Sequence, residues 1–268
     1  MIKPKKSLGQ HFLVDKNIIQ KIIKKARLRP DDIVVEIGAG KGELTFPVAY
    51  EVAHVFAIEK DSKLFSVLGN SIAQKGISNV TLVKEDVLKW DFSEIRPLIK
   101  ERKAVVLGNI PYNISSPLIE KLIEKKALIE KAVIMLQVEF ARRLVAFPNT
   151  KEYGALTVVL GYHATVRKLF EVSRNAFFPR PKVDSMVVEI VFDKEYPEVN
   201  ERSFRLFVHG AFAHRRKKII NSLAGYLGPM GIGKEELGQI LKRCGIDPDK
   251  RAQSLRIEDF LCLASFYN

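Results

Sequence analysis

Residues 104–112 read AVVLGNIPY, and this stretch decides how the chain is organised. Ala104 to Leu107 is an apolar run that predicts a buried parallel strand. Ser116 and Pro117 follow shortly afterwards and have the residue types that begin a helix. Residues 108–112 are therefore expected to form a loop between a strand and a helix. Open α/β sheets place their chemistry in loops of this kind.

The residue types in this loop suit one reaction. An exocyclic amine on a nucleobase is a poor nucleophile because its lone pair is delocalised, so a catalyst must offer acceptors that draw the nitrogen out of conjugation. Asn109 carries a side-chain carbonyl that can accept one N–H. Pro111 favours an extended conformation of Ile110, whose main-chain carbonyl can accept the second N–H of the amine. Tyr112 offers an aromatic face on which a base can stack. An isolated motif of this kind also occurs as an ordinary proline turn with a packed tyrosine. The rest of the chain must therefore distinguish a catalytic loop from a structural turn.

A glycine-rich loop follows the first predicted strand of the sheet. The strand spans residues 33–37, the loop Gly38 to Gly42, and a helix is expected from about Glu43. The pattern is similar to a dinucleotide fingerprint, but the carboxylate of Glu43 would repel a pyrophosphate. Glu36 and Glu43 instead suit a ligand without phosphate that carries positive charge. S-adenosylmethionine is such a ligand, through its ammonium and sulfonium groups.

Two further strand ends carry acids. A strand at 54–58 ends in Glu59, which stands where an acid meets ribose hydroxyls. A strand at 80–83 leads to Asp86, which can accept from the adenine amine of the cofactor. Each acid alone is more often a solvated turn residue. Together with the glycine-rich loop and Asn109, they predict one cofactor site along a single sheet edge.

The net charge of +13 is concentrated at the two ends of the chain. Residues 1–30 hold nine Lys/Arg against one acid, and residues 201–268 hold twelve against seven. The segment 31–200 is neutral. Cationic ends around a neutral centre indicate a polyanionic partner, although a lysine-rich surface also suits heat adaptation.

The two cysteines, Cys244 and Cys262, form no CxxC pair, and we expect no disulfide framework and a reducing, cytoplasmic setting. The five histidines lack ligand spacing, so no metal is implied. No apolar run approaches the length of a membrane span, and the lysine-rich N-terminus lacks the apolar region of a signal peptide. We expect a protein that is neither secreted nor membrane-embedded.

Two domains are predicted. Residues 1–198 would form an α/β domain with a basic N-terminal arm and a helix capped by Asp15. Residues 199–268 would form a small all-helical, RNA-binding domain, with helices near 202–213, 216–226, 234–244 and 256–266. The run 155–160 fits either a helix or a strand. In the connector 177–182, Phe177 could supply the second aromatic wall that a flipped base requires, or could simply plug the core.

With these pieces in place, the chain resembles the ribosomal RNA adenine dimethyltransferases, most closely the KsgA type that acts on small-subunit rRNA. The resemblance spans essentially residues 5–266 and rests on LGQHFL (8–13), EIGAG (36–40), NIPYNIS (109–115) and AFFP (176–179). It implies a Rossmann-like, class I methyltransferase domain that uses S-adenosylmethionine. It also implies dimethylation at N6 of two adjacent adenosines near the 3′ end of the rRNA, a link to ribosome biogenesis, and a monomer that acts on an assembling subunit.

The resemblance also implies roles for individual residues. Cofactor contacts fall on His11, Leu13, Gly38, Gly40, Glu59, Asp86 and Asn109. Catalysis falls on Asn109, Ile110, Pro111 and Tyr112, with Phe177 stacking on the target base. His11 is a modest departure, since some members carry Asn there.

Three alternatives stay open. The related family that dimethylates large-subunit rRNA and confers macrolide resistance can share the loop, although KEYG at 151–154 and the basic C-terminal helices favour the KsgA type. DNA adenine and protein glutamine methyltransferases tend to have a second proline where Ile110 stands. A purely binding role in ribosome assembly or transcription would not need the cofactor acids or Asn109.

Overall fold

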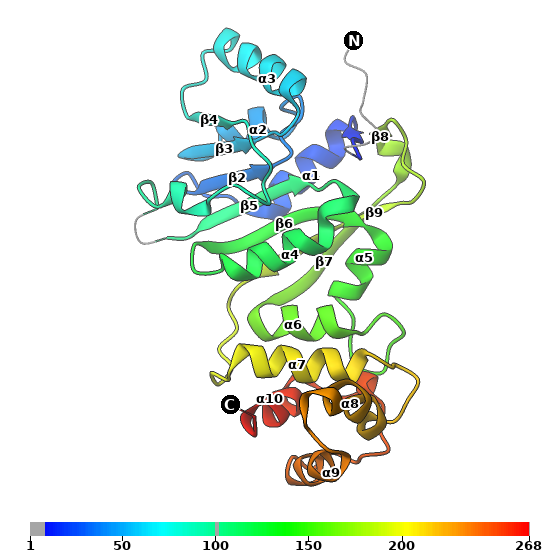
Figure 1. Cartoon of the computed structure of the whole chain (residues 1–268). Coiled ribbons are helices and arrows are strands. Elements are labelled where there is room, and N and C mark those ends of the chain that lie inside the picture. The colour runs from blue at the N-terminus through cyan, green and yellow to red at the C-terminus, as the bar shows by residue number, and fades with distance from the viewer. Residues whose placement is uncertain (1–8, 100–101, 268) are drawn as a thin grey trace. The chain divides into compact units, whose positions relative to one another are not determined.

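The computed structural model describes residues 9–99 and 102–267 (Figure 1). Lys3, Lys5 and Lys6 of the predicted basic arm lie outside these ranges. The main sheet has seven strands in the order β4-β3-β2-β5-β6-β9-β7. Their bounds are β2 Ile33–Ile37, β3 His54–Ile58, β4 Val80–Val83, β5 Ala104–Asn109, β6 Ile129–Gln137, β7 Thr165–Val172 and β9 Ser185–Val191.

The first five strands in this order are parallel, and β9 runs antiparallel between β6 and β7. The predicted bounds of β2, β3 and β4 are confirmed to the residue. Runs of β-branched residues form these strands because a parallel sheet is covered on both faces. The α/β, Rossmann-like fold is thereby confirmed.

Helices cover both faces of this sheet. The helix α1 (Lys16–Ala26) is capped by the Asp15 side chain, which accepts from the main-chain N–H groups of Asn17 and Ile18. Its apolar stripe packs with α2 (Thr45–Ala49) and with alternate residues of the strands, such as Val34, Val105 and Val133. Figure 1 shows α4 (Ser115–Glu124) in front of the sheet and α3 (Ser62–Gln74) beside β4.

Two helix starts predicted for the α/β domain were wrong by one or two residues. The helix α4 begins at Ser115 with Ile114 as its N-cap, so Ser116 is not the cap. A 3-10 turn at Tyr112–Ile114 leads directly into α4 and replaces a side-chain cap. The helix α2 begins at Thr45 rather than near Glu43, because the glycine-rich loop continues through Gly42, whose φ is 92°.

A two-stranded ribbon lies outside the main sheet. Its strands are β1 (Phe12–Leu13) and β8 (Phe177–Phe178), which run antiparallel. Phe12 pairs with Phe178 and Leu13 with Phe177. The ribbon fastens the segment before α1 to the connector between β7 and β9. Sequence patterning did not predict it, because each strand is only two residues long.

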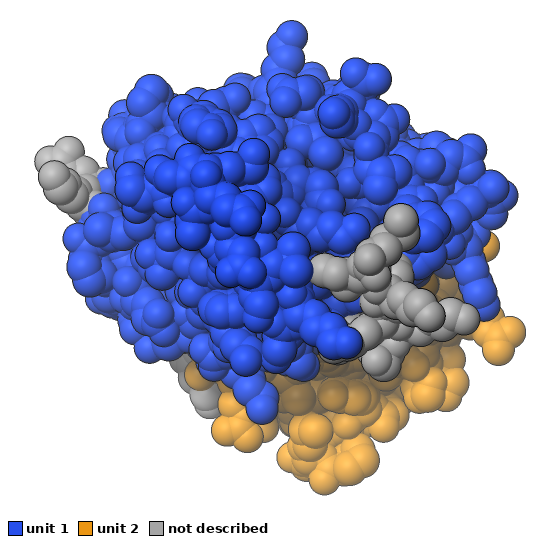
Figure 2. Space-filling model, turned by 90° about the horizontal axis from the view of Figure 1, so that it is seen from above, with its two compact units in different colours: residues 1–141, 165–193 blue, residues 142–164, 194–268 orange. Residues whose placement is uncertain are grey.

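The chain divides into two compact units, coloured separately in Figure 2. The first comprises residues 1–141 and 165–193, and the second 142–164 and 194–268. This division differs from the predicted boundary at residue 198, because the second unit also takes in residues 142–164. Within that unit, the helix α6 (Ala155–His163) packs against α7 and α10. The ambiguous run 155–160 is therefore helical.

The four predicted C-terminal helices are present, although the second begins at Ile219, three residues later than predicted. They are α7 (Glu201–Phe212), α8 (Ile219–Leu227), α9 (Lys234–Arg243) and α10 (Ile257–Ser265). Fully buried aromatic rings, Phe204, Phe207 and Phe260, fill the core of this unit. No helix in the described ranges is long and apolar enough to cross a membrane.

The expectation of unlinked cysteines was wrong. Cys244, which follows α9, forms a disulfide with Cys262 of α10 at an S–S distance of 2.09 Å. The two residues are 18 positions apart, and helix packing alone brings them together. A spacing rule for cysteine motifs gives no signal for such a pair.

Candidate active site

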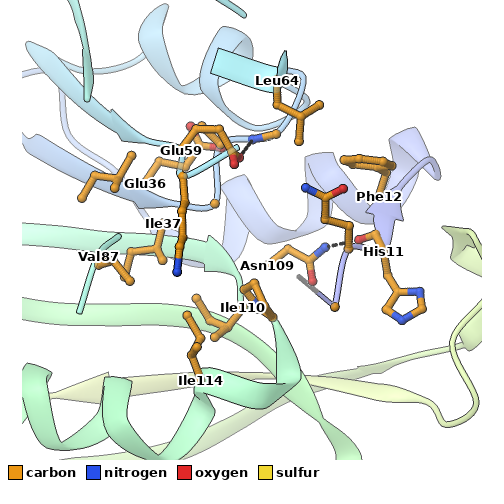
Figure 3. A pocket seen from close by; sticks show the side chains of 18 of the residues that line it. His11, Phe12, Glu36, Ile37, Glu59, Leu64, Val87, Asn109, Ile110 and Ile114 are labelled. Carbon is orange, nitrogen blue, oxygen red and sulfur yellow. Dashed lines mark hydrogen bonds between the residues drawn. The ribbon is translucent and has the colours of Figure 1, made fainter. Parts of the chain in front are cut away.

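The carboxyl ends of β2, β3, β4 and β5 meet at one edge of the sheet and line a cavity (Figure 3). The segment around β1 closes the cavity from another side. The structure brings nearly all of the predicted site residues to it. They are His11, Leu13, Gly38, Gly40, Glu59, Asp86, Asn109, Ile110, Pro111 and Tyr112.

Glycine is required at two positions of this edge. Gly38 has a φ of 72°, in the left-handed region, where the chain leaves β2 and turns over the cavity. Gly108 lies where β5 passes β2 so closely that a Cβ atom would stand 2.7 Å from the carbonyl oxygen of Ile37. Gly38 lets the main chain turn over the cavity, and Gly108 lets β5 lie close to β2.

Glu59 orders the loop that it faces. Its Oε2 accepts from the N–H of Gly40 at 2.9 Å, and its Oε1 accepts from the N–H of Asp61 at 2.7 Å. Each carboxylate oxygen has a second lone pair. Glu59 can therefore hold the loop and still accept hydrogen bonds from a diol in the cavity.

Three carboxyl groups, those of Glu36, Glu43 and Glu59, surround the glycine-rich loop. Burial raises the pKa of Glu36 to about 8, with the nearby Glu43 and Glu59 adding to the effect and the neighbouring Thr45 opposing it. Burial also raises the pKa of Glu43 and of Glu59. The Oε2 atom of Glu36 is buried and has no hydrogen-bond partner among the described residues. This environment disfavours a pyrophosphate and suits a cationic ligand.

Asp86 lines the cavity and forms an ion pair with Lys60, with 2.7 Å between the Oδ2 of Asp86 and the Nζ of Lys60. Its Oδ1 accepts from the N–H of Leu88 at 3.0 Å. Partial burial pushes the pKa of Asp86 upward, but the bonds from Lys60 and Leu88 outweigh it and hold the pKa below its ordinary value. Asp86 is thus a charged acceptor that can receive a further N–H, such as that of an adenine amine.

Asn109 is oriented by the N-terminal segment. Its Nδ2 donates to the main-chain oxygen of His11 at 2.8 Å, as the dashed line in Figure 3 shows. A carbonyl can only accept, so the Asn109 atom that faces it must be the NH₂ group. The side-chain oxygen therefore points the other way and has no partner among the described residues. It is available to a donor in the cavity.

Ile110 and Tyr112, in the same loop as Asn109, are also held in place. The N–H of Ile110 donates to Met135 of β6, and its carbonyl oxygen accepts from no described residue. Tyr112 is half-buried, and its hydroxyl lies 2.9 Å from the Oγ of the fully buried Ser185. The His11 ring stacks on Tyr112 with 5.7 Å between the ring centroids, and its Nδ1 donates to the carbonyl of Pro179 at 2.7 Å. Burial raises the pKa of Tyr112, so the phenol is neutral.

Phe177 is the predicted site residue that the structure does not bring to the cavity. Its side chain is only 4% exposed and belongs to the apolar cluster that contains Leu13 and Val187. The neighbouring Phe178 is 58% exposed. Of the two readings of Phe177, a wall for a base or a plug in the core, its burial favours the second.

Sequence reasoning missed Lys60, Phe12 and Ser185, which contact the site. Lys60 and Phe12 adjoin predicted residues and line the cavity, so neighbourhood in the sequence could have found them. Ser185 lies 73 positions from Tyr112, and only the sheet order places it there.

Comparisons with known proteins agree with this geometry. The family model for ribosomal RNA adenine dimethylase matches residues 1–268. The chain is 40% identical over 258 residues to the ribosomal RNA small subunit methyltransferase A of Desulforapulum autotrophicum, which covers 96% of this chain and 89% of that protein. It is also 40% identical over 276 residues to the protein of the same name from Pelotomaculum thermopropionicum, with 99% and 92% covered.

Solved structures show the same likeness. A dimethyladenosine transferase from Plasmodium falciparum superposes with a TM-score of 0.80 at 29% identity, covering 94% of this chain and 96% of the other. The 23S rRNA methyltransferase ErmE superposes with a TM-score of 0.70 at 27% identity, covering 94% and 97%. The chain belongs to the ribosomal RNA adenine dimethylase family, whose members transfer methyl groups from S-adenosylmethionine to adenine.

Proposed function

We propose that this protein dimethylates N6 of two adjacent adenosines near the 3′ end of small-subunit rRNA, as a step in the assembly of that subunit. The observation that carries the proposal is the orientation of Asn109, whose free side-chain oxygen points into a cavity with no phosphate-binding character. The 40% identity to proteins named for the small subunit supports the choice of substrate. The basic C-terminal segment suits a large RNA partner.

The residues present fit S-adenosylmethionine. Bound there, the cofactor supplies an electrophilic methyl group. Glu59 would accept from the ribose hydroxyls and Asp86 from the adenine amine, while His11, Leu13, Gly38 and Gly40 would shape the walls. The acidic surroundings of Glu36 favour the cationic amino acid end of the cofactor over an anionic ligand.

In the proposed mechanism the target adenine enters beside Tyr112, and its N6 amine donates to two acceptors. These acceptors are the side-chain oxygen of Asn109 and the carbonyl oxygen of Ile110, which lacks a described partner. Pro111 contributes by having no N–H to compete. Both acceptors stabilise the positive charge that develops on nitrogen, and no strong base is needed before methyl transfer. The cationic amine formed by each transfer then loses one proton to solvent, so after two transfers no N–H is left and the reaction stops at dimethyladenosine.

Phe177 enters this proposal in a changed role. Because its ring is buried behind the ribbon, it would support the wall of the cavity and would not stack on the target base. Of the phenyl rings that line the cavity, those of Phe12 and Tyr112, the ring of Tyr112 belongs to the same loop as Asn109 and is the one assigned to the target base.

The test is a transfer assay with purified substrates. Small subunits that lack the modification, free small-subunit rRNA and free large-subunit rRNA are each incubated with the protein and S-adenosylmethionine, and the RNA is mapped by mass spectrometry. Two adjacent dimethyladenosines in small-subunit rRNA are expected. Large-subunit rRNA is included because the structure is also similar to that of ErmE, a 23S rRNA methyltransferase. Methylation of large-subunit rRNA alone would assign the protein to the macrolide-resistance type. Binding without transfer would indicate a pure assembly factor.

A further inference from the structure

Two adjacent phenylalanines occupy opposite faces of the β1–β8 ribbon. Phe177 pairs with Leu13 and is buried, whereas Phe178 pairs with Phe12 and is 58% exposed. A large aromatic side chain left in solvent loses the stabilisation that burial would give it. The exposed ring is therefore unexplained by packing.

The pairing of Phe178 shows which way it faces. Partners across an antiparallel ribbon project to the same face, with their Cβ atoms about 5 Å apart. The Phe12 ring lines the cavity, and a Cβ on Gly40 would stand 3.8 Å from its Cδ1 atom. Figure 3 shows this ring at the edge of the cavity. Phe178 therefore extends the wall formed by Phe12 outward, from the cavity to solvent.

The loop that carries Phe178 is well held. The carbonyl of Pro179 accepts from His11 at 2.7 Å, and the guanidinium of Arg174 donates to the carbonyl of Lys182 at 3.0 Å. The main-chain N–H of Arg174 also donates to Asp184 at 2.9 Å. A ring on a fixed loop loses little conformational entropy when it binds a ligand.

The same loop is cationic on its outer side. The side chains of Arg180 and Lys182 are exposed and have no ion-pair partner among the described residues. An exposed aromatic ring next to two free cations is the combination that binds single-stranded nucleic acid, through base stacking and phosphate contacts. An apolar protein partner would not require these charges.

We propose that Phe178 is a stacking platform for the base immediately next to the target adenosine, with Arg180 and Lys182 contacting the adjoining phosphates. The proposal rests on the proposed function and assigns the neighbouring nucleotide to a separate position from the target base. An extruded adenine leaves its neighbour without a stacking partner. The platform replaces that partner and keeps the strand open at the mouth of the cavity.

The test combines kinetics with a fluorescent base. Phe178→Ala should raise the KM for RNA about tenfold, as expected for the loss of one base stack, while kcat and the affinity for S-adenosylmethionine stay unchanged. Phe178→Trp should restore the KM. The control is Tyr50→Ala, since Tyr50 is 74% exposed on the same unit and lies outside the cavity lining. Two RNAs are compared, one with 2-aminopurine on the 5′ side of the target adenosine and one with it on the 3′ side. The wild-type protein should quench the fluorescence of one of these RNAs, and Phe178→Ala should not.

Each outcome has a distinct meaning. If the wild type methylates RNA and Phe178→Ala has the same KM and the same fluorescence quenching as the wild type, the platform is refuted and the proposed function stands. A loss confined to kcat would also refute the platform, because the ring would then contact the target base itself. Wild-type protein that transfers no methyl group to any rRNA would refute the proposed function and the platform with it.

Discussion

The main-chain oxygen of His11 and the side-chain amide of Asn109 are joined by a 2.8 Å hydrogen bond across 98 positions of sequence. This bond fixes which end of the amide faces the cavity. The N-terminal segment therefore does more than close the cofactor site, because it sets the orientation of the acceptor at the reacting amine. The same residue stacks its ring on Tyr112 and anchors the loop at Pro179, so His11 connects three parts of the site.

The first prediction concerns that acceptor. Asn109→Ala should lower the rate of methyl transfer on the order of 10²-fold or more, because an acceptor aimed at developing charge is lost. Asn109→Asp should also be impaired, since a carboxylate cannot donate to the His11 carbonyl and would be repelled by it. Single-turnover rates test both variants. RNA affinity should change little, and cofactor affinity should be measured in the same variants by calorimetry. An Asn109→Ala protein with a nearly wild-type rate would show that the loop is only a structural turn.

The second prediction concerns Glu36, whose pKa of about 8 in the folded protein lies above its ordinary 4.5. Between these pH values the unfolded chain is ionised at this position while the folded chain holds the proton. The folded state then binds more protons, so stability falls as pH rises through this window, by up to about 1.4 kcal/mol per pH unit. Below pH 4.5 and above pH 8 this group contributes no slope.

Glu36→Gln removes the titration and should flatten the fall in unfolding free energy between pH 5 and 8, measured by urea denaturation. Glu51→Gln, at an exposed position, is the matched control and should leave the slope as it is in the wild type. Equal slopes in all three proteins would mean that Glu36 is ionised in the folded state.

A third prediction concerns the basic run 215–218, whose members differ in the structure. Arg215 donates through one nitrogen to the main-chain oxygens of Lys151 and Tyr153, each at 2.7 Å, and Lys218 pairs with Asp249 at 2.8 Å. Arg216 and Lys217 are exposed and have no ion pair among the described residues. These two are therefore the ones available to phosphates.

Reversing Arg216 and Lys217 to Glu should weaken RNA binding and reduce the log–log salt slope by roughly 0.7–0.9 for each lost phosphate contact. Cofactor affinity should not change. The matched control reverses Lys234 and Lys242, which are exposed on α9, with the same change in net charge. If both double variants lose affinity equally, the effect comes from net charge and not from this segment.

Much of the fold could be predicted because buried parallel strands have long apolar runs. The runs that became β2, β3 and β4 also ended at the acids and glycines of the site, so the strand ends located the cavity as well. The C-terminal helices were predicted by the spacing of their apolar residues, together with the breaks at Gly228 and Asp247.

The remaining features depend on contacts between distant segments. The β1–β8 ribbon pairs residues about 165 positions apart through two residues on each side, too few for a periodic signal. The burial of Phe177 and the exposure of Phe178 follow from that ribbon. The sequence cannot show which of two adjacent phenylalanines is buried, because the two residues are identical. The main-chain carbonyls that accept from Arg215 carry no sequence signature, so the sequence does not distinguish Arg215 from the neighbouring Arg216.

The last prediction concerns the bond between Cys244 and Cys262. The bond joins residues 18 positions apart and so restricts the conformations of the unfolded chain. This restriction should stabilise the folded second unit by about 3 kcal/mol. The helix α9 packs against α8, and the bond adds a covalent link to α10. Replacing both cysteines with Ser should lower the midpoint of chemical denaturation, and dithiothreitol should do the same to the wild type.

The double variant is its own control for the reductant, since dithiothreitol should then have no further effect. Cofactor affinity should be unchanged, because both cysteines lie in the second unit and the cavity is lined by residues of the first. Thiol labelling of protein that was denatured without reductant, followed by mass spectrometry, counts the free cysteines directly. Two labelled thiols in protein purified without reductant would contradict the bond, and the expectation of reduced cysteines drawn from their spacing would then hold.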